Sequence, residues 1–90
     1  MSKVKIIDFS SDWCPSCKKQ KPVFEDLEEE YQNVDFKSVN IDEESGLASE
    51  YGIRAVPTLV IEQSGEEVNR FVGFTEADTL REAIDKALGT

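Results

Sequence analysis

The chain has 90 residues, of which 39% are hydrophobic, and its 19 acidic against 10 basic residues give a net charge of −9. This length predicts one domain spanning residues 1–90, and the acidic surface disfavours binding to nucleic acids or anionic membranes. No apolar run approaches the roughly 20 residues of a membrane-spanning helix, and residues 1–11 have neither the apolar core nor the cleavage site that a signal peptide would show. We therefore expect a cytoplasmic protein, in which disulfides are rare unless they are catalytic or transient.

The first half of the chain predicts a strand–helix–strand unit. Residues 4–9, "VKIIDF", read as a short apolar strand, and a helix starts close to Cys14. Beyond it, apolar side chains recur at helical spacing at Phe24, Leu27 and Tyr31. Pro22 falls inside this pattern, so we expect it to kink the helix rather than end it. Residues 35–40, "DFKSVN", form a second strand, and the helical connection predicts that the two strands pair in parallel.

The next segments predict a short helix and a β-hairpin. Residues 43–53 read as a short helix ended by Gly52, since glycine is typical just past a helix terminus. Residues 57–74 contain two β-like runs on either side of Ser64-Gly65, which is a hairpin signal.

The last segment, residues 75–89, predicts a helix that starts with a capping box between Thr75 and Asp78. Gly89 would stop this helix, and its buried stripe would consist of Leu80, Ile84 and Leu88. The order of elements is therefore strand, helix, strand, helix, hairpin and helix. This order predicts an α/β layer structure.

The two cysteines, Cys14 and Cys17, could bind a metal, form a structural disulfide across a turn, or exchange electrons with a substrate. A structural zinc site needs four ligands, and the chain has no histidine and no third cysteine. A disulfide across so few residues removes little entropy from the unfolded chain. At a helix N-terminus, however, unpaired N–H groups and the helix dipole stabilise a thiolate. We therefore expect redox exchange, with Cys14 as the exposed nucleophile and Cys17 as the resolving thiol.

Four segments of the sequence resemble the thioredoxin family, and together they run through nearly the whole chain. They are "DFSSDWCPSCK", "VNIDE", "YGIRAVPTLVI" and "GEEVNRFVGF". A lone CxxC motif is a weak signal, whereas a CxxC motif followed at this spacing by "YGIRAVPT" is specific. The resemblance implies a minimal thioredoxin fold, which is a four-stranded mixed sheet of order 2-1-3-4 with three helices. It also implies thiol–disulfide oxidoreductase activity.

The resemblance further implies a set of substrate-binding residues around the cysteine pair. Trp13 matches the tryptophan that flanks the family's active site, and Val56-Pro57 matches its cis-proline dipeptide. An extended substrate chain is expected to pair with the backbone of Val56. Gly73 matches a glycine beside this groove, although a glycine at a hairpin end or bulge would look the same in sequence.

Asp8 is a carboxylate in an apolar run, which is costly unless the group is functional or reaches water at a strand end. In the family, the matching aspartate is buried behind the cysteines and helps the resolving thiol to gain or lose its proton. Burial would raise the pKa of Asp8 towards neutrality, which suits that role on Cys17.

The sequence also departs from the usual family pattern. The active-site motif is CPSC rather than CGPC, with Pro15 at a helix position where its missing N–H costs nothing. Ser38 stands where a lysine usually faces the buried aspartate, and Lys37 is its neighbour. These changes bear on the redox potential and the partners rather than on the exchange reaction.

The sequence therefore predicts a monomeric reductase of protein disulfides that needs no bound cofactor or metal and is recharged by an external reductase of the thioredoxin-reductase type. One alternative is glutaredoxin-like, glutathione-coupled activity. Against it, "VGFTEAD" has a single glycine and an acidic surrounding that would repel the carboxylates of glutathione. A second alternative is a non-catalytic module that uses the groove at Trp13 and Pro57 only to dock a partner.

Overall fold

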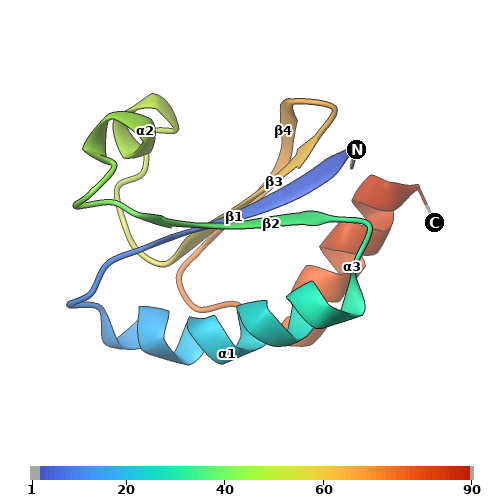
Figure 1. Ribbon diagram of the computed structural model, residues 1–90, viewed down its shortest axis with the longest axis horizontal. Helices are drawn as coiled ribbons and strands as arrows, with labels where there is room; N and C mark the ends of the chain where they lie inside the picture. Colours follow the sequence, from blue (N-terminus) through green and yellow to red (C-terminus); the bar gives the residue numbers. More distant parts are fainter. Residues whose placement is uncertain (1–2, 90) are drawn as a thin grey trace.

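The computed structural model describes residues 3–89, whose strands form one four-stranded sheet (Figure 1). The strands are β1 (Val4–Ser10), β2 (Asp35–Asn40), β3 (Thr58–Gln63) and β4 (Glu66–Val72). Their order is β2-β1-β3-β4, with β1 and β2 parallel and the other neighbours antiparallel. The mixed sheet of order 2-1-3-4 that the sequence predicted is confirmed.

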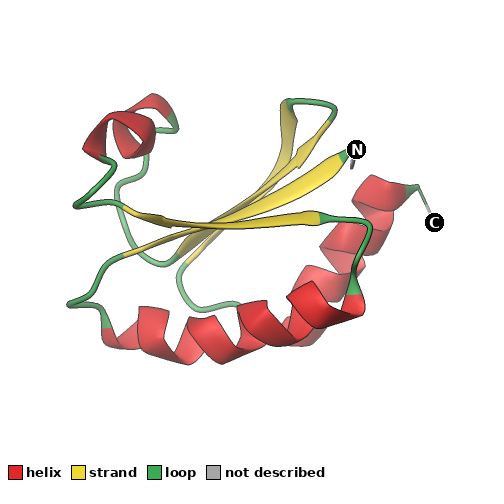
Figure 2. Ribbon diagram, viewed as in Figure 1, coloured by secondary structure: helices red, strands yellow, loops and turns green. Residues whose placement is uncertain are grey.

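Three helices cover the two faces of this sheet (Figure 2). The helices α1 (Pro15–Glu30) and α3 (Ala77–Leu88) pack on one face, and the short α2 (Ser45–Glu50) lies on the other. No helix in residues 3–89 is long and apolar enough to cross a membrane.

Alternation of side chains along β1 divides the interior into two cores. Val4 and Ile6 pack with buried residues of α1 and α3, whereas Ile7 and Phe9 pack on the side of α2. Because successive side chains of a strand point to opposite faces, Asp8 shares the face of Val4 and Ile6. This parity directs the carboxylate of Asp8 towards α1.

Helix α1 is amphipathic, and Pro22 lies inside it without ending it. Its buried side chains are Cys17, Gln20, Phe24 and Leu27. The ring of Phe24 meets that of Phe36 from β2 edge-on, at 5.2 Å between centroids. Complete burial of Leu27 stabilises the fold by about 2 kcal/mol. The buried stripe therefore fixes how α1 sits on the sheet.

The turn between β3 and β4 has the geometry that its sequence predicted. Ser64 and Gly65 both have positive φ, 52° and 84°, as a two-residue hairpin turn of the favoured twist requires. Gly52 follows α2 with φ of 66°, and Gly89 ends α3 with φ of 86°.

The start of α3 differs from the sequence-based prediction. The N-cap residue is Glu76 and makes no side-chain capping bond, so the predicted capping box of Thr75 and Asp78 is wrong. Thr75 is buried instead, and its hydroxyl donates to the carbonyl of Gly73. The predicted stripe is also incomplete, because Leu88 is only half-buried and alanines complete the buried face: Ala83 and Ala87.

Candidate active site

Cys14 is the N-cap residue of α1, and its sulfur accepts a hydrogen bond from the backbone N–H of Cys17 at 3.1 Å. Pro15 follows as the first helical residue, where its fixed φ suits the helix and its missing N–H leaves no donor unpaired. The helix dipole and this N–H both favour negative charge on the sulfur of Cys14. In its thiol form, Cys14 donates to the carbonyl of Val56, 3.5 Å away.

Exposure does not distinguish the two cysteines, contrary to the expectation that Cys14 is the exposed one. Cys14 is 4% exposed and Cys17 is 6% exposed. The sulfur of Cys14 is enclosed because the carbonyl of Val56, from the loop before β3, lies against it. Differences in reactivity between the thiols must therefore come from charge stabilisation rather than from access.

The environment of Cys17 opposes its ionisation. Burial, followed by the hydrogen bond and charge of Cys14, raises the pKa of Cys17 to about 12, and the charge of Asp8 acts in the same direction. Cys17 is therefore a neutral thiol at neutral pH. Its sulfur is also electrostatically coupled to the carboxylate of Asp8.

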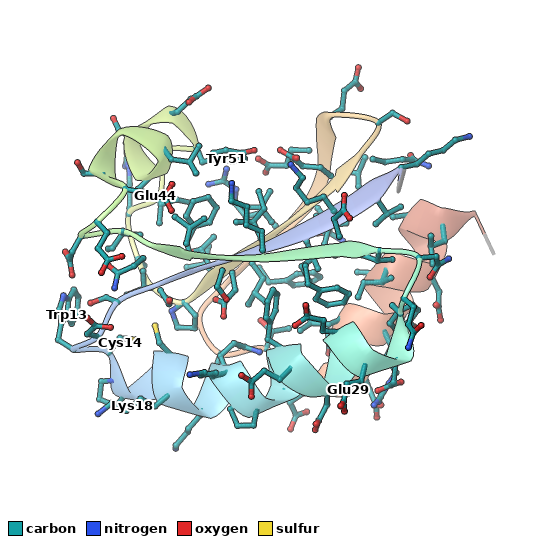
Figure 3. The ribbon with its side chains drawn as sticks, viewed as in Figure 1. Trp13, Cys14, Lys18, Glu29, Glu44 and Tyr51 are labelled. Carbon is teal, nitrogen blue, oxygen red and sulfur yellow. The ribbon has the colours of Figure 1, made fainter. Side chains whose placement is uncertain are left out.

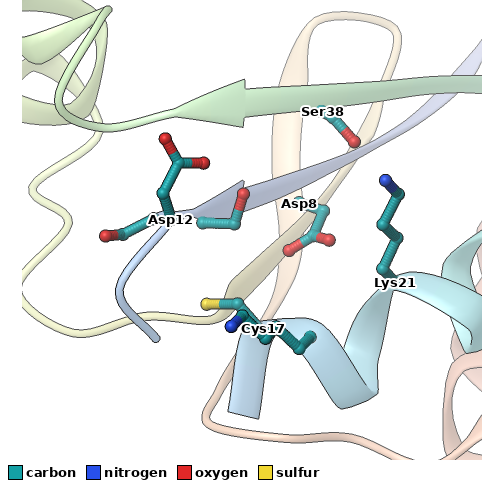
Figure 4. Close-up of a pocket in the computed structure, with 8 residues that line it drawn as sticks. Asp8, Asp12, Cys17, Lys21 and Ser38 are labelled. Atoms are coloured by element: carbon teal, nitrogen blue, oxygen red, sulfur yellow. The ribbon is translucent and has the colours of Figure 1, made fainter. Parts of the chain in front are cut away.

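Asp8 is 4% exposed, and loss of solvation raises its pKa from the ordinary 3.8 to about 6. Within residues 3–89, its Oδ1 atom has no hydrogen-bond partner. Asp8 and Cys17 face one polar cavity of about 290 Å³ (Figure 4). The other residues that line it are Ser10, Ser11, Asp12, Lys18, Lys21 and Ser38. The cavity offers room for water between the carboxyl and the thiol.

Sequence reasoning missed the contribution of α1 to this cavity. Ser38 pairs in register with Asp8, so the position where the family usually has a lysine carries a hydroxyl beside the carboxyl. Lys37 pairs with Ile7 and therefore lies on the opposite face. Two lysines line the cavity, Lys18 and Lys21, and the side chain of Lys21 extends from α1 towards the sheet (Figure 4). Its helical spacing of four residues from Cys17 was the available signal.

The expected substrate-binding residues surround the cysteine pair. Trp13 is 68% exposed and lies beside Cys14 ahead of α1 (Figure 3). The peptide bond between Val56 and Pro57 is cis. The N–H of Gly73 donates to the carbonyl of Pro57 at 2.7 Å. Together with the contact between Cys14 and the carbonyl of Val56, this bond joins three separate segments of the chain at one end of the sheet.

Gly73 has φ of 94°, a backbone conformation that side-chain-bearing residues rarely adopt. A Cβ atom built there would meet nothing within 4 Å, so its surroundings are open. Two apolar side chains flank it on the surface, Val72 and Phe74. Backbone conformation thus explains the glycine, while the open space leaves room for a partner.

A buried glutamine was also missed. Gln20 is fully buried on α1, and its amide makes two hydrogen bonds to the backbone of Thr75. The signal was a polar residue in the apolar stripe, three positions after Cys17 and four before Phe24. The described residues contain no group of three or more side chains that could hold a metal ion.

The profile of the thioredoxin family matches residues 1–86. The chain belongs to the thioredoxin family. It is 41% identical over 81 residues to a thioredoxin of Chlamydia caviae, covering 90% of this chain and 79% of the relative. It is 38% identical over 88 residues to a thioredoxin of Staphylococcus epidermidis, covering 97% and 85%.

Solved structures of thioredoxins agree with this assignment. A mutant thioredoxin from Halobacterium salinarum superimposes with a TM-score of 0.91 at 38% identity, covering 96% of this chain and 75% of that one. Thioredoxin from Fasciola hepatica superimposes with a TM-score of 0.89 at 34% identity, covering 96% and 82%. The thioredoxin fold that the sequence predicted is confirmed.

With its Cys14–Cys17 pair, this member of the family is a thiol–disulfide oxidoreductase that acts on protein disulfides. The prediction of this function from the sequence is confirmed. Membership of the family also implies disulfide-containing substrates and a reductase partner.

Proposed function

We propose that the chain works as a reductant of protein disulfides, with Cys14 as nucleophile, Cys17 as resolving thiol and Asp8 as proton acceptor. The observation that carries this assignment is the position of the Cys14 sulfur at the N-cap of α1, 3.1 Å from the N–H of Cys17. A thiolate is the attacking form in disulfide exchange, and this position favours the thiolate.

In the first step, the Cys14 thiolate attacks one sulfur of a substrate disulfide. A bond forms between Cys14 and that sulfur, the substrate S–S bond breaks, and the other substrate sulfur leaves as a thiolate. An extended substrate chain would pair with the backbone at Val56 and contact Trp13, Pro57 and Gly73. The exposure of Trp13 and the open space beside Gly73 support this placement.

In the second step, Cys17 loses its proton and attacks the sulfur of Cys14. This forms the Cys14–Cys17 disulfide and releases the second substrate sulfur as a thiolate, so the substrate gains two electrons. Once Cys14 is in a mixed disulfide, its negative charge no longer raises the pKa of Cys17. The resolving thiol therefore becomes easier to ionise only after the first step has occurred.

Asp8 is suited to take the proton from Cys17. Its carboxyl faces the same cavity, and with a pKa of about 6 it is mostly ionised at neutral pH but remains a usable base. Water in the cavity would carry the proton between the two groups. Burial supplies the shift, so the role depends on the position of Asp8 on β1.

We place the protein in the cytoplasm, because a dithiol that works as a reductant needs a reducing compartment. We expect it to act there as a monomer. An external reductase of the thioredoxin-reductase type would return the Cys14–Cys17 disulfide to the dithiol. The reaction needs no bound cofactor or metal. The acidic net charge of −9 disfavours nucleic acid and anionic membranes as partners.

The proposal is tested by trapping the mixed disulfide with a disulfide-bonded protein such as insulin. A Cys17→Ser variant should accumulate a covalent adduct through Cys14, because no thiol remains to release the substrate. The matched Cys14→Ser variant should form little adduct. An adduct mainly through Cys17 would reverse the assignment. Adduct formation with oxidised glutathione but not with insulin would favour the glutathione-coupled alternative, and no adduct with either would favour a docking module.

A further inference from the structure

Gln20 joins the helix that carries both cysteines to the loop that follows β4. Its side-chain amide donates to the carbonyl of Thr75 at 2.9 Å and accepts from the N–H of Thr75 at 2.8 Å. Gln20 is 0% exposed, and Thr75 is 8% exposed. The paired bonds therefore form in a site from which water is excluded, where hydrogen bonds are strong and unpaired groups are costly.

The loop held by Gln20 also contacts the cis-proline segment, which lies against Cys14. The hydroxyl of Thr75 donates to the carbonyl of Gly73 at 3.1 Å, and the N–H of Gly73 donates to the carbonyl of Pro57 at 2.7 Å. On the other side, the thiol of Cys14 contacts the carbonyl of Val56. A closed chain of contacts thus runs from α1 through the loop and the cis-proline segment back to α1.

A glutamine is well matched to this position because its amide has one acceptor and one donor within reach of the two backbone groups of Thr75. An apolar side chain of the same length would leave both backbone groups buried without a partner. The loop would then have to move to find other partners. Such a movement would shift Gly73 and the exposed Phe74 relative to Cys14.

We propose that Gln20 is a positioning residue for substrate binding, which fixes the loop of residues 73–75 at the distance from Cys14 that an extended substrate requires. This inference rests on the proposed function, since it concerns the surface on which a protein disulfide would lie. Gln20 does not touch the reacting sulfurs. It acts through Thr75 on the loop of residues 73–75.

The test compares Gln20→Met, which keeps the length of the side chain but loses both hydrogen bonds, with Phe24→Leu. Phe24 lies on the same buried stripe of α1 and packs against Phe36, so Phe24→Leu controls for general loosening of the helix. Insulin reduction is measured over a range of insulin concentrations with dithiothreitol as the reductant. Two further assays, reduction of a small aromatic disulfide and alkylation of Cys14, measure the reactivity of the thiols independently of protein-substrate binding.

Gln20→Met should raise KM for insulin about tenfold, with kcat, small-disulfide reduction and Cys14 alkylation each within about twofold of the native chain. Phe24→Leu should leave KM within about twofold. An equal rise in KM for both variants, or an equal loss in all three assays for Gln20→Met, would overturn the inference. Failure of the native chain to reduce insulin would instead overturn the proposed function.

The native protein supplies a second test that needs no variant. If the two hydrogen bonds between Gln20 and Thr75 persist in solution, the backbone amide of Thr75 should exchange with solvent at least about 100-fold more slowly than in an unstructured peptide. Exchange at the unstructured rate would overturn the inference, whatever the variants do. Should Gln20→Met fail to fold, Gln20→Asn, whose shorter amide cannot span the same gap, is judged by the same KM readout.

Discussion

Asp8 and Ser38 lie side by side in register across the parallel strands β1 and β2. The side chain beside the carboxyl in the sheet is therefore a neutral hydroxyl, and the lysine of β2, Lys37, belongs to the opposite face. Burial is the cause of the raised pKa of Asp8, about 6. The cavity that Asp8 shares with Cys17 therefore holds a carboxyl whose pKa lies close to neutral pH.

Removing the charge of Asp8 should slow the second step of the reaction. We expect Asp8→Asn to slow release of the substrate from the mixed disulfide about 100-fold, because Cys17 loses its proton acceptor. The first attack by Cys14 should change little. Rapid-quench kinetics on a single turnover separate the two steps. Asp12→Asn, at an exposed carboxylate of the same cavity, is the control, and unchanged release in Asp8→Asn would remove Asp8 from the mechanism.

The same substitution should stabilise the protein at neutral pH. A carboxyl whose pKa is higher in the folded state than in the unfolded state favours folding at low pH, and this contribution is lost as the pH rises from about 4 to above about 6. The shift corresponds to about 3 kcal/mol. The free energy of unfolding of Asp8→Asn should therefore exceed that of the native chain at neutral pH and converge with it in acid. Urea denaturation at a series of pH values measures this difference, and a constant difference would contradict it.

The two thiols should react with an alkylating agent at different rates although both are buried. The sulfur of Cys14 accepts the N–H of Cys17 at the start of α1, while the pKa of Cys17 is raised to about 12. We expect alkylation of Cys14 to be at least about 100-fold faster near neutral pH. A time course with iodoacetamide, resolved by peptide mass spectrometry, measures both rates in one sample. Equal rates would remove the assignment of the nucleophile.

Gly73 is expected to matter for binding as well as for folding. Gly73→Ala should cost about 1 kcal/mol of stability, because φ of 94° strains a residue with a Cβ atom. It should also raise KM for a protein disulfide, because the new methyl group occupies the open space at Gly73 that a substrate would approach. Gly52→Ala is the control, since Gly52 has φ of 66° and open surroundings at the end of α2. Equal effects of the two variants on KM would show that strain alone is responsible.

Much of the fold could be predicted because its signals are local. The apolar run of β1, the Ser64-Gly65 turn and the stripe of α1 each appear within a few residues of sequence. The start of α3 could not be predicted in this way. The backbone N–H of Thr75 that a capping box would use is bound by Gln20, which is 55 residues away in sequence, and the hydroxyl of Thr75 donates to the carbonyl of Gly73.

The features of the site can likewise be divided into those with local sequence signals and those that depend on distant segments. The CxxC motif at a strand–helix junction predicts the sulfur chemistry, and the parity of β1 explains why Asp8 points towards α1. The enclosure of Cys14 depends on the carbonyl of Val56, and the lining of the cavity depends on Lys21 reaching across from α1. These contacts arise only when segments distant in sequence pack together, so composition and spacing do not reveal them.

The most direct test of the central claim is the redox potential of the Cys14–Cys17 pair. The protein is equilibrated in glutathione buffers of defined potential, its free thiols are trapped, and the internal disulfide is quantified by mass. A reductant of the thioredoxin kind should form this disulfide as a two-electron couple near about −270 mV. Failure to form an internal disulfide at any potential would contradict the account, because the exchange cycle ends in that bond.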